Sequence, residues 1–78
     1  MTVERVRAAW KAQPFLPFRI HMADGRSVFV GHPDYMSMAP QSRIFAVHHA
    51  HDDGMDFVDL LLVTAIEVPA SEIAVSGN

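Results

Sequence analysis

The first residues of the chain repeat their apolar positions with the period of an α-helix. Val3, Val6 and Trp10 recur at helical spacing on one side, and Thr2 is suited to cap the start. Two prolines follow soon afterwards and cannot continue a helix comfortably. The pattern predicts a short amphipathic helix over residues 2–12, anchored on the rest of the domain by Trp10.

From Phe18 onward the apolar period changes to two, which is the pattern of half-buried strands around a turn at Gly25. A three-residue loop with Gly25 left-handed in a bulge would pair Ile20 with Val28 and Phe18 with Val30. A two-residue loop would mix apolar and polar side chains on each face. We therefore predict the three-residue loop. The side chains then expected to face outward are those of Arg19, His21 and Phe29.

Short apolar runs separated by turn residues continue to the end of the chain. Further strands are predicted at residues 35–38, 43–49 and 63–68, with one helical turn over 59–62 and a loop over 50–55 leading into Phe57 and Val58. The predicted fold is mainly β with one N-terminal α-helix: a small five-stranded barrel, Sm-like or SH3-like, because closure removes exposed strand edges. We expect a single domain over residues 1–69, with the barrel at 18–68 and a flexible C-terminal tail at 70–78.

Length and composition bound the architecture further. The chain has 78 residues, of which 50% are hydrophobic and 19% charged, so it can form one core but not two. It contains no cysteine and therefore no disulfide to support a domain near the lower size limit. Self-association into a homo-oligomer is expected.

The charge balance argues against a dedicated nucleic-acid binder. Six basic and nine acidic residues give a net charge of −3, whereas domains that neutralise phosphates are usually basic as a whole. The longest apolar run, residues 60–63, is far shorter than a membrane span. No signal-peptide pattern is present at residues 1–13, and we expect a cytoplasmic protein with no membrane partner.

The order of the predicted elements from residue 18 to 68 resembles the Sm-like barrel of bacterial Hfq and its relatives. The resemblance rests on the strand at 18–22 before Asp24-Gly25 and on the strand at 63–67 after a loop and turn. It implies a small barrel that assembles. The Hfq family reads RNA with a Tyr-Lys-His run before its last strand, whereas this chain has Asp59-Leu60-Leu61 there, which cannot stack on bases or hold a phosphate.

A second and more specific resemblance covers most of the chain. It is similar to a family of short, uncharacterised bacterial proteins that carry Pro-Phe-x-Pro-Phe, Asp-Gly-Arg, His-Pro and Asp-Leu-Leu-Leu-Val-Thr-x-Ile-Glu. These motifs stand here at residues 14–18, 24–26, 32–33 and 59–67. The resemblance implies no activity.

A histidine-rich segment is the strongest candidate for chemistry. Residues 48–53 read His-His-Ala-His-Asp-Asp, and imidazole and carboxylate suit zinc, nickel or copper. The candidate metal ligands are His49, His51 and Asp53, since His49 and His51 face the same way in an extended segment. The alternative is that these polar residues only cap a strand end and solvate a loop.

No catalytic pattern stands out elsewhere. The chain has no cysteine nucleophile, no serine in a nucleophile-elbow motif and no phosphate-binding glycine loop. We expect neither an enzyme nor a cofactor. The leading hypothesis is a protein interaction or assembly module that binds a protein partner or itself, followed by a nucleic-acid binder and a metal-responsive module. The basic residues that a nucleic-acid site would use are Arg5, Arg7, Lys11, Arg19 and Arg26.

Overall fold

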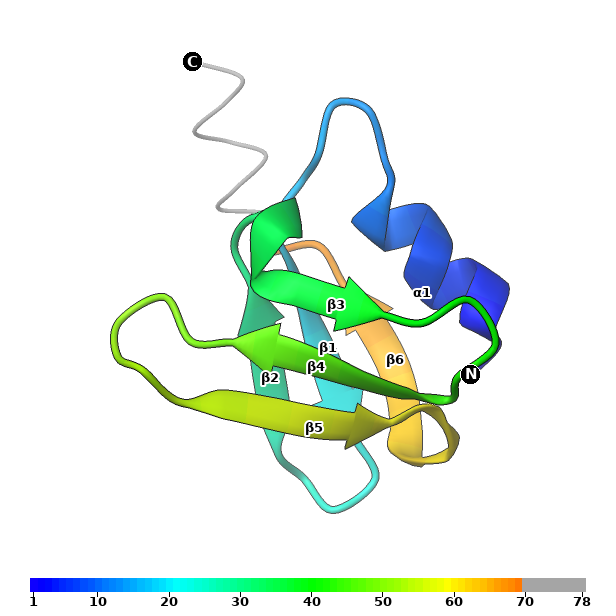
Figure 1. The fold of residues 1–78 in the computed structure, drawn as a ribbon. Helices are drawn as coiled ribbons and strands as arrows, with labels where there is room; N and C mark the ends of the chain where they lie inside the picture. The colour runs from blue at the N-terminus through cyan, green and yellow to red at the C-terminus, as the bar shows by residue number, and fades with distance from the viewer. Residues whose placement is uncertain (70–78) are drawn as a thin grey trace.

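Six short strands form two three-stranded antiparallel sheets in the computed structural model, which describes residues 1–69 (Figure 1). In chain order the elements are α1 (Val3–Trp10), β1 (Phe18–Met22), β2 (Ser27–Val30), η1 (Pro33–Tyr35), β3 (Met36–Met38), β4 (Ile44–His48), β5 (Met55–Asp59), η2 (Leu60–Leu62) and β6 (Val63–Glu67). The first sheet has the order β2-β1-β6 and the second the order β3-β4-β5. The predicted tail at 70–78 lies outside the described residues.

The predicted five-stranded barrel is wrong. Within residues 1–69, β2 and β6 pair only with β1, and β3 and β5 pair only with β4, so neither sheet closes on itself or joins the other. Two single-turn helices, η1 and η2, interrupt the chain where it passes between the sheets. At η1, Pro33 has no N–H to donate to a ladder. The sheets are joined by side-chain packing instead of by continuous hydrogen bonding.

The β1–β2 hairpin confirms the predicted register. Ile20 lies opposite Val28 and Phe18 opposite Val30, and all four side chains are buried. The N–H of Met22 donates to the carbonyl of Arg26 (2.8 Å), and Gly25 has a φ of 91°. The three-residue loop with a left-handed glycine therefore sets which face of the hairpin enters the core.

Replacing Gly25 by alanine should destabilise the protein although space for a Cβ is present. No heavy atom lies within 4 Å of the added Cβ, so the cost comes from the positive φ alone, about 1 kcal/mol. Asparagine tolerates this conformation better, so Gly25→Asn should cost less than Gly25→Ala. Urea unfolding of the two variants measures the difference. Equal stability of wild type and Gly25→Ala would contradict a left-handed residue here.

Helix α1 begins as the sequence predicts and ends slightly earlier. The Thr2 hydroxyl accepts from the N–H of Arg5 (3.4 Å), and the helix ends at Trp10. Trp10 packs against the core, and its indole N–H donates to the carbonyl of Pro33 (2.9 Å). Since Pro33 belongs to η1, the indole ties α1 to the segment that connects the sheets, which confirms its role as an anchor.

The core lies between the two sheets and is capped by α1 (Figure 1). Its buried side chains are Val6, Phe18, Ile20, Met22, Val28, Val30, Met36, Phe45, Val47, Val58, Leu60 and Val63. They come from α1, every strand and η2, which together form one hydrophobic cluster. Strand β4 is the central strand of its sheet, as its two apolar faces predict. No helix among the described residues is both long enough and apolar enough to span a bilayer.

The sixth strand, β5, is the element that the sequence pattern did not reveal. It occupies Met55–Asp59, whereas the sequence predicts a loop up to Met55 and no strand at Phe57 and Val58. Only Val58 of this strand is buried. An edge strand with one buried side chain lacks the alternation that identifies β1, and it is defined by its pairing with β4 over Ile44–His48.

Candidate functional site

The connection between β4 and β5 carries most of the candidate chemistry, and residues 49–54 are called the histidine loop below. The N–H of His49 donates to the carbonyl of Gly54 (2.9 Å), which extends the β4–β5 ladder by one pair and closes the loop at its base. The loop therefore projects from the end of an antiparallel hairpin (Figure 1). Its side chains are positioned by short contacts with one another.

His49 is held between two carboxylates. Its Nδ1 lies 2.8 Å from Oδ1 of Asp52, and its Nε2 lies 2.9 Å from Oδ2 of Asp56 on β5. Carboxylate oxygens only accept, so the ring donates to both when it is doubly protonated. The hydrogen bond to Asp56, and to a smaller extent the hydrogen bond to Asp52, raises the pKa of His49 above its usual value. The ring thus joins the turn to the following strand.

Asp52 is oriented by the backbone as well as by His49. Its Oδ1 accepts from the N–H of Gly54 (2.6 Å). This hydrogen bond has the largest effect in lowering the pKa of the Asp52 carboxyl, and the hydrogen bond from His49 has the next largest. Gly54 lies close to this contact: a Cβ there would lie 2.8 Å from Nδ1 of His49 and 2.9 Å from Oδ1 of Asp52, so both side chains would have to shift. The loop is therefore built around the contact between His49 and Asp52.

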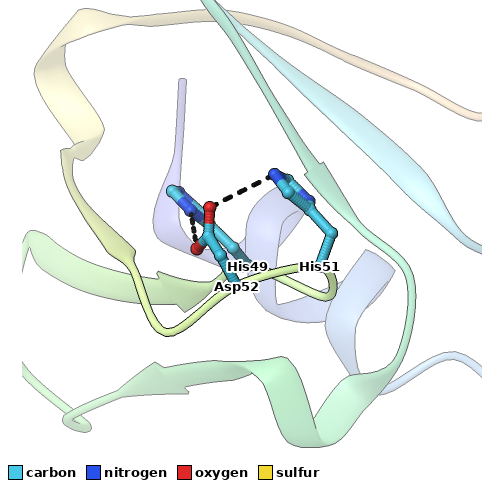
Figure 2. A group of neighbouring side chains, drawn as sticks. All are labelled: His49, His51 and Asp52. Carbon is cyan, nitrogen blue, oxygen red and sulfur yellow. Dashed lines mark hydrogen bonds and ion pairs between the residues drawn. The ribbon is translucent and has the colours of Figure 1, made fainter.

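His51 completes the group of metal-ligating side chains. Its ring stacks on that of His49, with centroids 5.5 Å apart and planes 4° from parallel. Figure 2 shows the carboxylate of Asp52 between the two rings, and Nε2 of His51 lies 3.4 Å from Oδ2 of Asp52. One ligand atom from each of His49, His51 and Asp52 lies within 4.8 Å of the others.

The structure therefore brings together two of the three predicted metal ligands. His49 and His51 are adjacent as expected, whereas Asp53 is exposed and does not belong to the group. Asp52 takes the third place because the N–H of Gly54 turns its carboxylate back toward His49. The glycine after the two aspartates is the sequence signal that could have distinguished them.

A hollow lies beside the histidine loop and reaches the first sheet. It has a volume of about 260 Å³ and is lined by Ser27, Val28, Phe29, His49, Ala50, His51 and Asp56. This volume is below the range for small-molecule pockets, about 300–1,000 Å³. The hollow has room for water or a small anion beside the imidazoles, and it is small for an organic substrate.

The five basic residues proposed for nucleic acid are mostly engaged by the chain itself. Arg26 pairs with Asp24 (Nε to Oδ2, 2.8 Å). The pKa of the Asp24 carboxyl is lowered most by the hydrogen bond from the backbone N–H of Arg26, followed by the one from its side chain. Arg19 lies over the ring of Phe29 at 5.3 Å. Arg19 lies on β1 and Arg26 in the β1–β2 turn.

The other three basic residues lie on α1 or at its end. Arg7 donates to the carbonyl of Pro40 (3.2 Å), and Lys11 lies 4.1 Å from the centroid of the Trp10 ring. Arg5 is exposed. Two of these three cations therefore already have partners within the protein.

The outer face of the second sheet carries an apolar, largely exposed patch, with His48 and Asp59 on the same face. Direct cross-strand pairs place Ala46 beside Phe57 and His48 beside Met55, on the face opposite the buried pair Phe45 and Val58. Of the four residues that define this apolar outer face, three are large and exposed. The four residues are Ile44 (41% exposed), Ala46, Met55 (40%) and Phe57 (70%).

A single-turn helix adds two more exposed leucines directly after β5. In η2, Leu61 is 69% and Leu62 49% exposed, while Leu60 is buried. Asp59 fixes this turn, since its Oδ1 accepts from the N–H of Leu61 (3.0 Å), and the predicted helical turn is confirmed. The turn holds Leu61 and Leu62 at the surface.

Comparison of the chain with protein families, with curated proteins and with solved structures gives no match.

Proposed function

We propose that the protein is a non-enzymatic interaction and assembly module that binds a second copy of itself through the apolar outer face and the free edge of β5. The observation that carries this proposal is the exposure of Phe57. This phenylalanine lies at the centre of β5 with 70% of its surface exposed. Aromatic side chains of this kind dominate the energetics of protein interfaces.

Neighbouring side chains extend the apolar surface around Phe57. Met55 lies two residues away on the same strand, and Ile44 lies on the same face of β4. An exposed patch formed by several large apolar side chains is typical of interaction sites. For a chain of this size, association also removes apolar surface that the small core cannot cover.

The edge position of β5 favours a second copy as the occupant. Among the described residues β5 pairs only with β4, so its other edge is open to a further strand. Antiparallel pairing of two β5 strands centred on Phe57 would place Met55 opposite Asp59 and Asp56 opposite Val58. No acid would then face an acid. A two-fold axis would relate the two copies and place their apolar patches side by side on one face of the combined sheet.

The acidic side chains of β5 already have partners within the chain. Asp56 contacts His49 at 2.9 Å, and Asp59 lies 3.4 Å from Nε of Arg43. The cost of bringing two acidic strands together is reduced because each carboxylate has a cation or hydrogen-bond donor beside it. The charge on β5 is therefore compatible with self-pairing.

A concentration series of the native mass tests the proposal. Light scattering or sedimentation should show a mass that rises with concentration from 8.7 kDa, the mass of one chain, toward twice that value. A mass that stays at 8.7 kDa up to about 1 mM protein would contradict it, since a Kd weaker than that corresponds to less than about 4 kcal/mol of binding free energy.

A further inference from the structure

The histidine loop places one ligand atom from each of His49, His51 and Asp52 within 4.8 Å of the others. His49 and Asp52 are 2.8 Å apart at Nδ1 and Oδ1, and His51 and Asp52 are 3.4 Å apart at Nε2 and Oδ2. Tetrahedral zinc, with bonds of about 2.0–2.1 Å, separates its ligand atoms by about 3.3 Å. His51 and Asp52 are exposed, so rotation of these two side chains can bring the ligand atoms to that spacing.

The groups behind these ligands are also those that metal sites use. Nε2 of His49 faces Oδ2 of Asp56 at 2.9 Å, so an Nε2–H that donates to Asp56 leaves the Nδ1 lone pair for a metal. This is the carboxylate–histidine–metal arrangement that fixes the tautomer of ligand histidines. The N–H of Gly54 orients the Asp52 carboxylate in the same way.

We propose that the histidine loop binds one divalent transition-metal ion of the zinc class through Nδ1 of His49, Nε2 of His51 and the carboxylate of Asp52. The ion takes the place of the proton on Nδ1 of His49, and Asp56 keeps its hydrogen bond to Nε2. Both histidines line the 260 Å³ hollow, which leaves room for a water or small anion as a fourth ligand.

The donor set defines the class of ion. Two imidazole nitrogens and one carboxylate suit zinc, nickel and copper, whereas magnesium and calcium prefer sites made of oxygen ligands. No thiolate is available, because the chain has no cysteine. The loop should therefore discriminate strongly between zinc and magnesium.

Calorimetric titration with ZnCl₂ tests the site, with MgCl₂ as the comparison ion. Wild type should bind one zinc per chain, and His51→Gln should weaken binding at least about tenfold. His51 is 81% exposed, so its replacement should not affect folding. Two controls are His48→Gln, the neighbouring exposed histidine, and His32→Gln, whose Nδ1 lies 3.7 Å from Asp34. Both should stay within about twofold of wild type.

Two further measurements separate this site from general histidine binding. Nitrogen NMR of the imidazole rings should show zinc shifts at Nδ1 of His49 and Nε2 of His51. Asp56→Asn, which alters a supporting group and no ligand, should weaken zinc binding by about 10–100-fold. Equal losses in His51→Gln and in the two control variants, or no zinc binding by wild type, would overturn the proposal.

Discussion

Phe18→Ala should remove about a quarter or more of the stability of the protein. Phe18 is fully buried at the start of β1, and its ring lies 5.8 Å from that of Phe15. Truncating a buried phenylalanine costs about 3–5 kcal/mol. Stabilities of about 0.05–0.15 kcal/mol per residue give a chain of this length only about 4–12 kcal/mol in total. Circular dichroism and urea unfolding should show a transition at much lower urea or none.

A matched substitution separates loss of packing from loss of a phenylalanine. Phe29 lies in the same hairpin but is 40% exposed, and its ring contacts Arg19 instead of the core. Phe29→Ala should therefore cost about 1 kcal/mol or less. Similar losses in the two variants would contradict the register that buries Phe18 and turns Phe29 outward.

That register was predictable because the information for it is local. Along β1 each buried side chain alternates with a partly exposed one, and along β2 the alternation is complete. With the turn glycine fixing the loop length, only one register places Ile20 and Val28 on the same face. A three-residue turn and the apolar period of two were sufficient to predict the register of the hairpin.

That the strands form two open sheets was not predictable in the same way. Whether β2 or β5 meets another strand depends on pairings between residues far apart in the chain, and no local alternation encodes them. The one-turn helix at Leu60–Leu62 was anticipated. Its N-cap Asp59 ends β5 and so helps to separate the sheets, which a barrel would have joined.

The candidate site shows the same division between local and long-range information. The residue types of the histidine loop were evident, and His49 and His51 are adjacent in space. The choice of Asp52 over Asp53 follows from a backbone hydrogen bond to Gly54, which is a property of the folded turn. The contact of Asp56 with His49 depends on β5, the strand that the sequence pattern left out.

Phe57→Ser should weaken self-association by about 30–1,000-fold, the effect of removing a central aromatic residue worth about 2–4 kcal/mol at an interface. Phe57 makes little contact with its own chain, since 70% of its surface is exposed, so the folded monomer should be retained. Serine removes the aromatic surface without adding charge, which keeps the net charge of −3 unchanged. Sedimentation over a range of concentrations measures the dissociation constant directly.

The matched control is Phe29→Ser, because Phe29 is also an exposed phenylalanine at a strand position but lies in the other sheet. It should leave the dissociation constant within about threefold of wild type, since substitutions outside an interface rarely change affinity. If Phe29→Ser weakened association as much as Phe57→Ser, the interface would not be centred on β5. If Phe57→Ser left the mass of the assembly unchanged, the apolar outer face would not be the surface that joins two copies.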